Sequence, residues 1–99
     1  MNNKRYYVYI VRCKKGALYT GFSTNVEKRV ETHNKGKGAK CLKMLGLPVS
    51  CECKIEVGSI GEALSLEYRI KKMKKVEKEA FILEKNNARV AIIGRAPDS

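Results

Sequence analysis

The sequence is short of the features that would place it in a membrane or leave it unfolded. Its 99 residues contain no apolar run of about 18 and no basic-then-apolar leader, so we expect neither a membrane span nor a signal peptide. Only 2 residues are proline, while 43% are hydrophobic and 31% charged, which is typical of a folded domain rather than a disordered chain. We therefore predict a cytoplasmic protein with one small core.

Acidic residues are scarce as well. The chain holds 10 Asp and Glu against 21 Lys and Arg, which gives a formal net charge of +11. A field of this sign concentrates polyanions through long-range attraction and release of their counterions, so nucleic acid is the partner that the charge favours. Charge alone leaves two alternatives open: a basic surface kept for solubility, and one that meets an acidic protein.

No CxxC pair occurs among the four cysteines, Cys13, Cys41, Cys51 and Cys53. A zinc site that joined some of them to His33 would have a spacing unlike the common structural patterns. We expect reduced, buried thiols instead. Because alternate residues of a strand point to the same side, Cys51 and Cys53 should share one face.

Two β-strands joined by a short turn are predicted near the N-terminus. Residues 6–13, YYVYIVRC, are β-branched and aromatic without a breaker. ALYTGF at 17–22 returns as the second strand after the turn residues KKG, whose glycine suits a positive φ. The segment therefore predicts a β-hairpin.

The turn also predicts the register of the two strands. Pairing Cys13 with Ala17 sets Tyr9 opposite Gly21 and makes Tyr9 and Tyr19 diagonal neighbours, about 7–8 Å apart on one face. Glycine at this position leaves space beside the two phenols. A slip of one residue would separate them, because it moves every side chain of one strand to the other face.

Thr24 and Glu27 have the spacing of a capping box, which predicts a helix over about residues 25–34. At about 100° per residue, Arg29 and His33 lie beside the apolar stripe of this helix rather than opposite it. We expect both side chains where the helix meets the sheet, not in bulk solvent.

Residues 34–48, NKGKGAKCLKMLGLP, are rich in glycine and lysine and are predicted to form a loop. Flexible glycines with interleaved lysines suit contact with phosphates, and a merely solvated loop is the alternative. The candidate nucleic-acid-binding residues are Lys35, Lys37, Lys40 and Lys43.

One strand and two helices are predicted in the second half of the chain. VSCECKIEV at 49–57 alternates like a strand, a second capping box precedes a helix at 60–74, and a last helix covers about 76–84. We find no repeat and no interdomain linker. Residues 1–87 are expected to form one domain, followed by a tail at 88–99 with room for a short strand.

A carboxylate falls inside the apolar stripe of the helix predicted at 60–74, at Glu67. Burying a charge is costly unless it is paired. An ion pair with Lys71, one turn further on, is the structural explanation. A metal ligand or an acid/base group is the functional one. The local sequence leaves both open.

Five motifs in order make the chain resemble the GIY-YIG nuclease superfamily over about residues 6–83: YVYIV, YTG, NVEKRVETHN, GKGAK and EALSLEYRIK. The chain is most similar to a branch of small, stand-alone, uncharacterised bacterial proteins. The resemblance implies an α/β (α+β) fold, with a three-stranded antiparallel sheet flanked by helices in the order β-β-α-β-α-α. The elements predicted from the residues have that order too.

The resemblance also implies an active site, in which Gly21 is the structural glycine of the second half-motif. The implied catalytic residues are the two motif tyrosines, a helix arginine and histidine, and a glutamate that holds the metal: Tyr9, Tyr19, Arg29, His33 and Glu67. The cofactor would be a single Mg²⁺ or Mn²⁺ ion. Either tyrosine is a candidate general base.

The activity implied in this way is divalent-metal-dependent endonucleolytic hydrolysis of DNA, with a place in DNA repair or recombination. RNA as a substrate is left open, as is a protein partner that supplies targeting. Two alternatives stand beside the enzyme: a non-catalytic nucleic-acid-binding module with the same fold, and an adaptor to an acidic protein.

Overall fold

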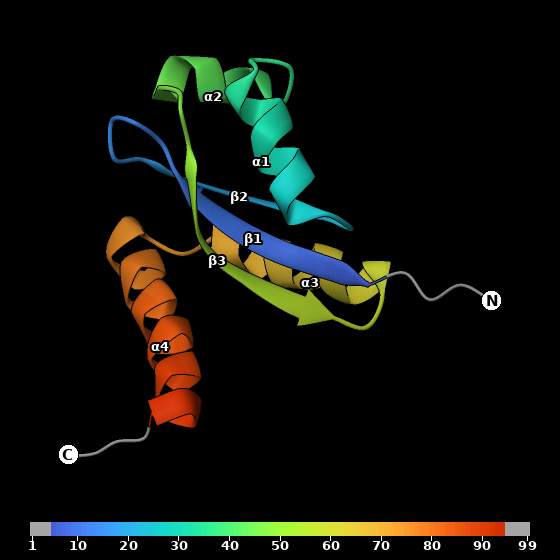
Figure 1. Cartoon of the computed structure of the whole chain (residues 1–99), viewed down its shortest axis with the longest axis vertical. Helices are drawn as coiled ribbons and strands as arrows, with labels where there is room; N and C mark the ends of the chain where they lie inside the picture. The colour runs from blue at the N-terminus through green and yellow to red at the C-terminus, as the bar shows by residue number, and fades with distance from the viewer. Residues whose placement is uncertain (1–4, 95–99) are drawn as a thin grey trace.

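Three antiparallel strands form the centre of the structure, with β1 between β2 and β3 and helices on both faces (Figure 1). The computed structural model describes residues 5–94. The elements, in chain order, are β1 Tyr6–Arg12, β2 Leu18–Ser23, α1 Val26–Asn34, α2 Lys40–Leu45, β3 Ser50–Val57, α3 Ile60–Lys71 and α4 Lys75–Gly94. The predicted α+β class and three-stranded antiparallel sheet are confirmed, and α2 is added to the predicted order.

The hairpin of β1 and β2 has the predicted register. The Cys13 amide donates to the Ala17 carbonyl at 2.7 Å, and Gly16 adopts a φ of +98° in the turn, a conformation that glycine reaches without strain. Tyr9 consequently pairs with Gly21 across the two strands. The slip that would have separated the motif tyrosines does not occur.

Alternate residues of β1 supply two cores, one on each side of the sheet. Val8 and Ile10 are buried with residues of α3 and α4, whereas Tyr9 and Val11 are buried with residues of α1 and α2. Figure 1 shows the same arrangement, with α1 and α2 on one side of the sheet and α3 on the other. A central strand buried on both faces explains why apolar side chains occupy consecutive positions of β1.

The N-cap of α1 is Asn25 rather than Thr24. The Asn25 side-chain oxygen accepts the Lys28 amide at 3.0 Å, and the Asn25 amide donates to the Ser23 hydroxyl at 3.0 Å. The turn thus orients an asparagine, which is among the strongest N-cap residues. The predicted capping box was wrong by one position, although the helix that it predicted is present.

The short helix α2 lies inside the segment 34–48 that was predicted to be a loop. Leu42 is 1% exposed and anchors α2 in the core beside Tyr9 and Val11, and Gly46 follows the helix with a φ of +105°. The prediction of a continuous loop was therefore wrong here. Glycines and lysines dominate the composition, but one buried leucine is enough to dock a helical turn on the sheet.

A β-bulge in β3 turns its two cysteines to opposite faces. Ile10 pairs with Cys53 and Val11 pairs with Cys51, which leaves Glu52 as an extra residue between them. Because adjacent residues of β1 face opposite sides, their partners do as well. Cys53 is 4% exposed and Cys51 is exposed, so the prediction that both cysteines share a buried face was wrong.

Helix α4 meets the sheet through polar contacts. The Arg12 guanidinium, at the end of β1, donates to both carboxylate oxygens of Glu79 at 2.7 and 2.9 Å and to the carboxylate of Glu52 at 2.9 Å. One turn and two turns further on, Ile82 is 5% exposed and Asn86 donates to the Glu52 carbonyl at 3.3 Å. These contacts combine polar groups with one buried apolar side chain, and they determine which side of α4 faces the sheet.

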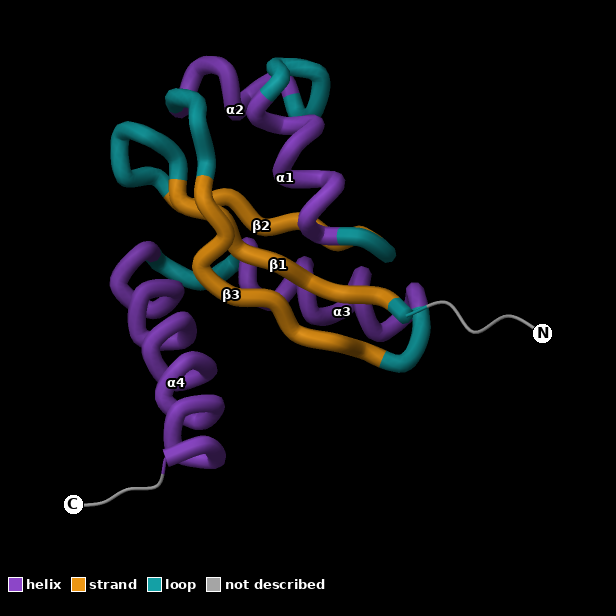
Figure 2. The backbone as a smooth tube through the Cα atoms, viewed as in Figure 1, coloured by secondary structure: helices purple, strands orange, loops and turns teal. Residues whose placement is uncertain are grey.

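The outer side of α4 carries exposed apolar side chains, and the C-terminal part of the helix extends into the segment predicted as a tail. Val76 and Leu83 are 72% and 61% exposed. Residues 88–94 continue the helix, where the sequence had left room for a short strand, and Figure 2 shows α4 leading away from the sheet. Residues 95–99 lie outside the described part of the chain. Within that part, no helix has the length and apolar content needed to span a membrane.

Thr20 presents a buried hydroxyl that no residue of the described part of the chain satisfies. The residue is 2% exposed, and its Oγ1 atom has no hydrogen-bond partner among the described residues. Replacing it by valine, which has nearly the same shape, should raise the free energy of unfolding by about 1 kcal/mol because a buried, unpaired hydroxyl is removed. Thermal unfolding should then shift upward by roughly 4–8 °C.

Thr32→Val is the matched control for Thr20→Val. The Thr32 hydroxyl donates to the Lys28 carbonyl at 3.0 Å, so its removal should bring no gain in stability. A lower melting temperature for Thr20→Val would contradict the expectation and would indicate that a partner such as a buried water satisfies the Thr20 hydroxyl.

Candidate active site

A buried tyrosine–histidine pair lies at the centre of the site. Tyr9 comes from β1 and His33 from the last turn of α1, and each is 1% exposed. The Tyr9 hydroxyl and His33 Nε2 are 2.9 Å apart, within hydrogen-bonding distance. His33 therefore lies deeper than the sequence predicted, beneath the helix rather than at its boundary.

Strand β2 supplies the second tyrosine and the space beside the first. The Tyr19 ring meets the His33 ring edge-on, with centroids 5.7 Å apart. A Cβ atom at Gly21 would lie 2.6 Å from the Tyr9 hydroxyl oxygen, closer than side chains tolerate. Tyr9 and Tyr19 thus contact the same imidazole, and Gly21 leaves room for the Tyr9 phenol.

Burial and charge shift the protonation of the central pair. Burial raises the pKa of the Tyr9 phenol above its ordinary value of about 10, and the neighbouring Arg29 side chain partly offsets this. Burial also lowers the pKa of His33, and the Arg29 charge acts in the same direction. At neutral pH the protein thus holds a neutral phenol against a neutral imidazole.

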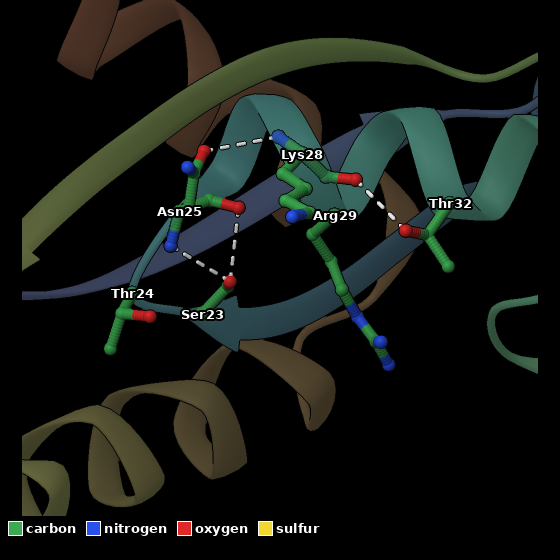
Figure 3. A pocket seen from close by; sticks show the side chains of 6 residues that line it. All are labelled: Ser23, Thr24, Asn25, Lys28, Arg29 and Thr32. Atoms are coloured by element: carbon green, nitrogen blue, oxygen red, sulfur yellow. Dashed lines mark hydrogen bonds between the residues drawn. The ribbon is translucent and has the colours of Figure 1, made fainter.

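Arg29 lies at the solvent-exposed side of the site, one turn before His33. It lines an open pocket at the start of α1 (Figure 3). The other lining residues are all polar or positively charged: Ser23, Thr24, Asn25, Lys28 and Thr32. With two cations and no carboxylate, this pocket suits an anion such as a phosphate. Arg29 is more exposed than the sequence predicted, since its residue surface faces solvent.

Glu67 comes from α3, which packs against β1 and β2. Its side chain is 17% exposed and lies 3.3 Å from the Lys71 ammonium, the ion pair expected on structural grounds. Its charge also reaches the site, because it adds to the rise in the Tyr9 pKa that burial and Tyr19 produce. The carboxylate is thus paired with Lys71, and its charge makes only the smallest of the contributions to the Tyr9 pKa.

The donor set around Glu67 fits a hard divalent cation better than zinc. Across residues 5–94, no cluster of three or more His, Cys, Asp or Glu side chains is found. Zinc sites need three or four such ligands. Mg²⁺ keeps several waters and is commonly bound through one or two carboxylates and substrate phosphates. A single, partly exposed carboxylate at Glu67 meets that requirement.

The four predicted nucleic-acid-binding lysines lie outside this cluster. All four are exposed, along the segment from the end of α1 to α2: Lys35, Lys37, Lys40 and Lys43. Lys35 is 3.4 Å from the Glu31 carboxylate, an exposed i,i+4 pair that contributes little to stability. Their exposure leaves them available to a polyanion.

Two features of the site were not predicted from the sequence: the polar residues that line the pocket beside Arg29, and the loop that contacts the His33 ring. Lys28 and Thr32 share the pocket with Arg29. Because they lie one turn apart on α1, their spacing could have predicted that they share one side of the helix. Gly38 and Ala39 touch the His33 ring. Nothing local predicts that contact, since it depends on how the loop folds back over α1.

The catalytic-domain profile of the GIY-YIG family matches residues 5–88 of the chain. Among curated relatives, the UPF0213 protein YazA of Bacillus subtilis is 37% identical over 98 residues, which is 99% of this chain and 98% of that protein. The UPF0213 protein SH2523 of Staphylococcus haemolyticus is 46% identical over 81 residues, covering 82% of this chain and 98% of that one.

Two solved structures resemble the chain as well. The solution structure of the UPF0213 protein BH0048 from Bacillus halodurans has a TM-score of 0.54 at 36% identity, over 82% of this chain and 85% of that one. The solution structure of EF2693 from E. faecalis has a TM-score of 0.54 at 25% identity, over 99% and 97% of the two chains.

Proposed function

The chain belongs to the GIY-YIG superfamily, and from this and the geometry of the site we propose that it is a divalent-metal-dependent endonuclease acting on DNA. The observation that carries the proposal is that both motif tyrosines contact the buried His33 ring, Tyr9 through a 2.9 Å hydrogen bond and Tyr19 edge-on. Arg29 lies one turn before His33 on α1, and we propose that Glu67 of α3 completes the set.

Each residue of this set has a role that its surroundings support. Arg29 binds the scissile phosphate, because a guanidinium fork matches two phosphate oxygens and offsets the charge that develops on them. One of the two motif tyrosines, as the phenolate formed after its own proton has passed to solvent, accepts a proton from the attacking water. His33 orients Tyr9 through their hydrogen bond. The exposed lysines beyond α1 hold the flanking backbone through charge.

Glu67 would hold the metal ion. A bound Mg²⁺ or Mn²⁺ would supply Lewis-acid stabilisation of the leaving oxygen. The protein's part is to keep the carboxylate reachable, which its partial exposure allows. We also propose a place for the reaction in DNA repair or recombination.

The proposal is tested by incubating the purified full chain with nicked, branched, single-stranded and duplex DNA, and with RNA. We expect cleavage of at least one DNA form in Mg²⁺ or Mn²⁺ and none after chelation. Binding should weaken as salt rises, because phosphate contacts release counterions. Tight binding without cleavage of any substrate under any divalent metal would overturn the enzyme and leave a binding module.

One contact favours that non-catalytic module as a second candidate. The Lys71 ammonium already compensates the Glu67 carboxylate, so the carboxylate has a structural reason to be there. The two candidate functions differ in whether a divalent metal ion is needed for activity. For a binding module, affinity for DNA is the only activity, and replacing Glu67 would leave it intact.

A further inference from the structure

Gly38 lies against the edge of the His33 ring that is turned away from Tyr9. A Cβ atom built at this position would overlap the His33 ring, most severely at Nδ1, and would still be only 2.7 Å from Cε1. The φ of Gly38 is outside the left-handed region, unlike that of Gly36 at +78°. The backbone conformation therefore does not require glycine at position 38; the close approach to the imidazole does.

The next residue makes a directional contact with the same ring atom. The Ala39 amide donates to His33 Nδ1 at 3.4 Å. A nitrogen that accepts a hydrogen bond carries no hydrogen of its own, so a neutral ring bonded in this way has its hydrogen on Nε2. Nε2 is the atom that lies 2.9 Å from the Tyr9 hydroxyl.

We infer that Gly38 and Ala39 are positioning residues that hold His33 in its Nε2–H tautomer, so that the histidine donates a hydrogen bond to the Tyr9 oxygen. Gly38 lets the loop approach the ring, and the Ala39 amide selects the tautomer. His33 then cannot take the proton of Tyr9, because its one free lone pair faces the loop.

The direction of this bond distinguishes the two motif tyrosines. With His33 donating from one side and the Arg29 guanidinium near, the groups around the Tyr9 oxygen are donors, and donors favour a phenolate over a phenol. Tyr19 instead meets the ring edge-on, without such a bond. The Arg29 donor only partly offsets the rise in the Tyr9 pKa that burial produces, so the Tyr9 phenol is neutral at rest and the two tyrosines differ in their hydrogen bonding. The consequence for cleavage rests on the proposed nuclease function, whereas the tautomer does not.

The chain offers a direct measurement of the tautomer because it contains one histidine. Long-range proton–nitrogen correlation spectra of the nitrogen-15-labelled full chain, at about pH 8 where the ring is neutral, report which ring nitrogen carries the hydrogen. We expect a single Nε2–H form without metal or nucleic acid. An Nδ1–H form, or a mixture of the two, would overturn the inference.

Gly38→Ala should disturb this pattern. The added methyl group pushes the loop off the ring, so the Nε2–H form should give way to a mixture, and kcat should fall by about 100-fold with little change in KM. Gly61→Ala is the matched control: its Cβ would meet only the Ser59 hydroxyl, at 3.8 Å, so spectrum and kcat should stay as in the parent. An unchanged spectrum for Gly38→Ala would refute the role of the loop.

Tyr9→Phe provides a second test that keeps the loop intact. The tautomer should remain Nε2–H, because the Ala39 amide rather than the phenol selects it; its loss would overturn the inference. These spectra are independent of cleavage. An inactive protein with the Nε2–H tautomer would refute the proposed function alone, and an active protein with the other tautomer would refute the inference alone.

Discussion

Replacing Glu67 by glutamine should lower the rate of metal-dependent DNA cleavage by roughly a thousandfold or more. The amide keeps the shape of the side chain but lacks the charge that a hard divalent cation requires, and a metal ion contributes several kcal/mol to the transition state, at about 1.4 kcal/mol per tenfold in rate. Affinity for DNA should be kept. Single-turnover cleavage with saturating protein and metal separates the chemical step from binding.

Lys71→Ala is the control that separates the two explanations of the carboxylate. This variant removes the ion-pair partner of Glu67 and leaves the ligand. Both variants should fold, because a pair of this exposure contributes no more than about 1 kcal/mol. If Glu67 were only a structural partner, Lys71→Ala and Glu67→Gln would lower cleavage alike. Equal losses would therefore contradict the metal-holding role.

Arg29→Lys should lower kcat for cleavage by roughly 100-fold or more. Lysine keeps the positive charge but loses the planar fork that binds two phosphate oxygens at once, and removing one preorganised donor typically costs a factor of this size. Because Arg29 is exposed on the surface of α1, the free energy of unfolding should change by less than about 0.5 kcal/mol. Circular dichroism melts and single-turnover rates check both parts.

Lys28→Arg is the reciprocal exchange in the same pocket. It keeps the total charge as Arg29→Lys does, so a pocket that acts only through charge would show no effect from either variant. We expect full cleavage activity for Lys28→Arg and the large loss only for Arg29→Lys. Full activity in Arg29→Lys would assign Arg29 to general electrostatic attraction.

Several features of the site could be predicted from the residues because they depend on short-range geometry. The turn at Gly16 determines the register of the hairpin, and two-residue alternation then places Tyr9 and Tyr19 on one face with Gly21 opposite Tyr9. Helical periodicity likewise placed Glu67 in the stripe that faces the sheet. Each of these rests on one short stretch of consecutive residues.

Other features depend on contacts between segments far apart in the chain. The bulge that turns Cys51 outward arises from the pairing of β3 with β1, and the rotation of α4 depends on Arg12, which is 67 positions from Glu79. Local patterns carry no information on such partners, because any exposed carboxylate in the last helix was an equal candidate for Arg12.

The sequence by itself thus determined the fold class and the register of the hairpin, and through its resemblance to a family it predicted the residues of the candidate site. The tertiary structure alone decided how deeply His33 is buried and which of its nitrogens faces Tyr9. The reason is physical: periodicity and turns determine which face a side chain takes, whereas the tautomer of an imidazole depends on donors brought from elsewhere. Here that donor comes from the loop that folds back over the ring at Gly38 and Ala39.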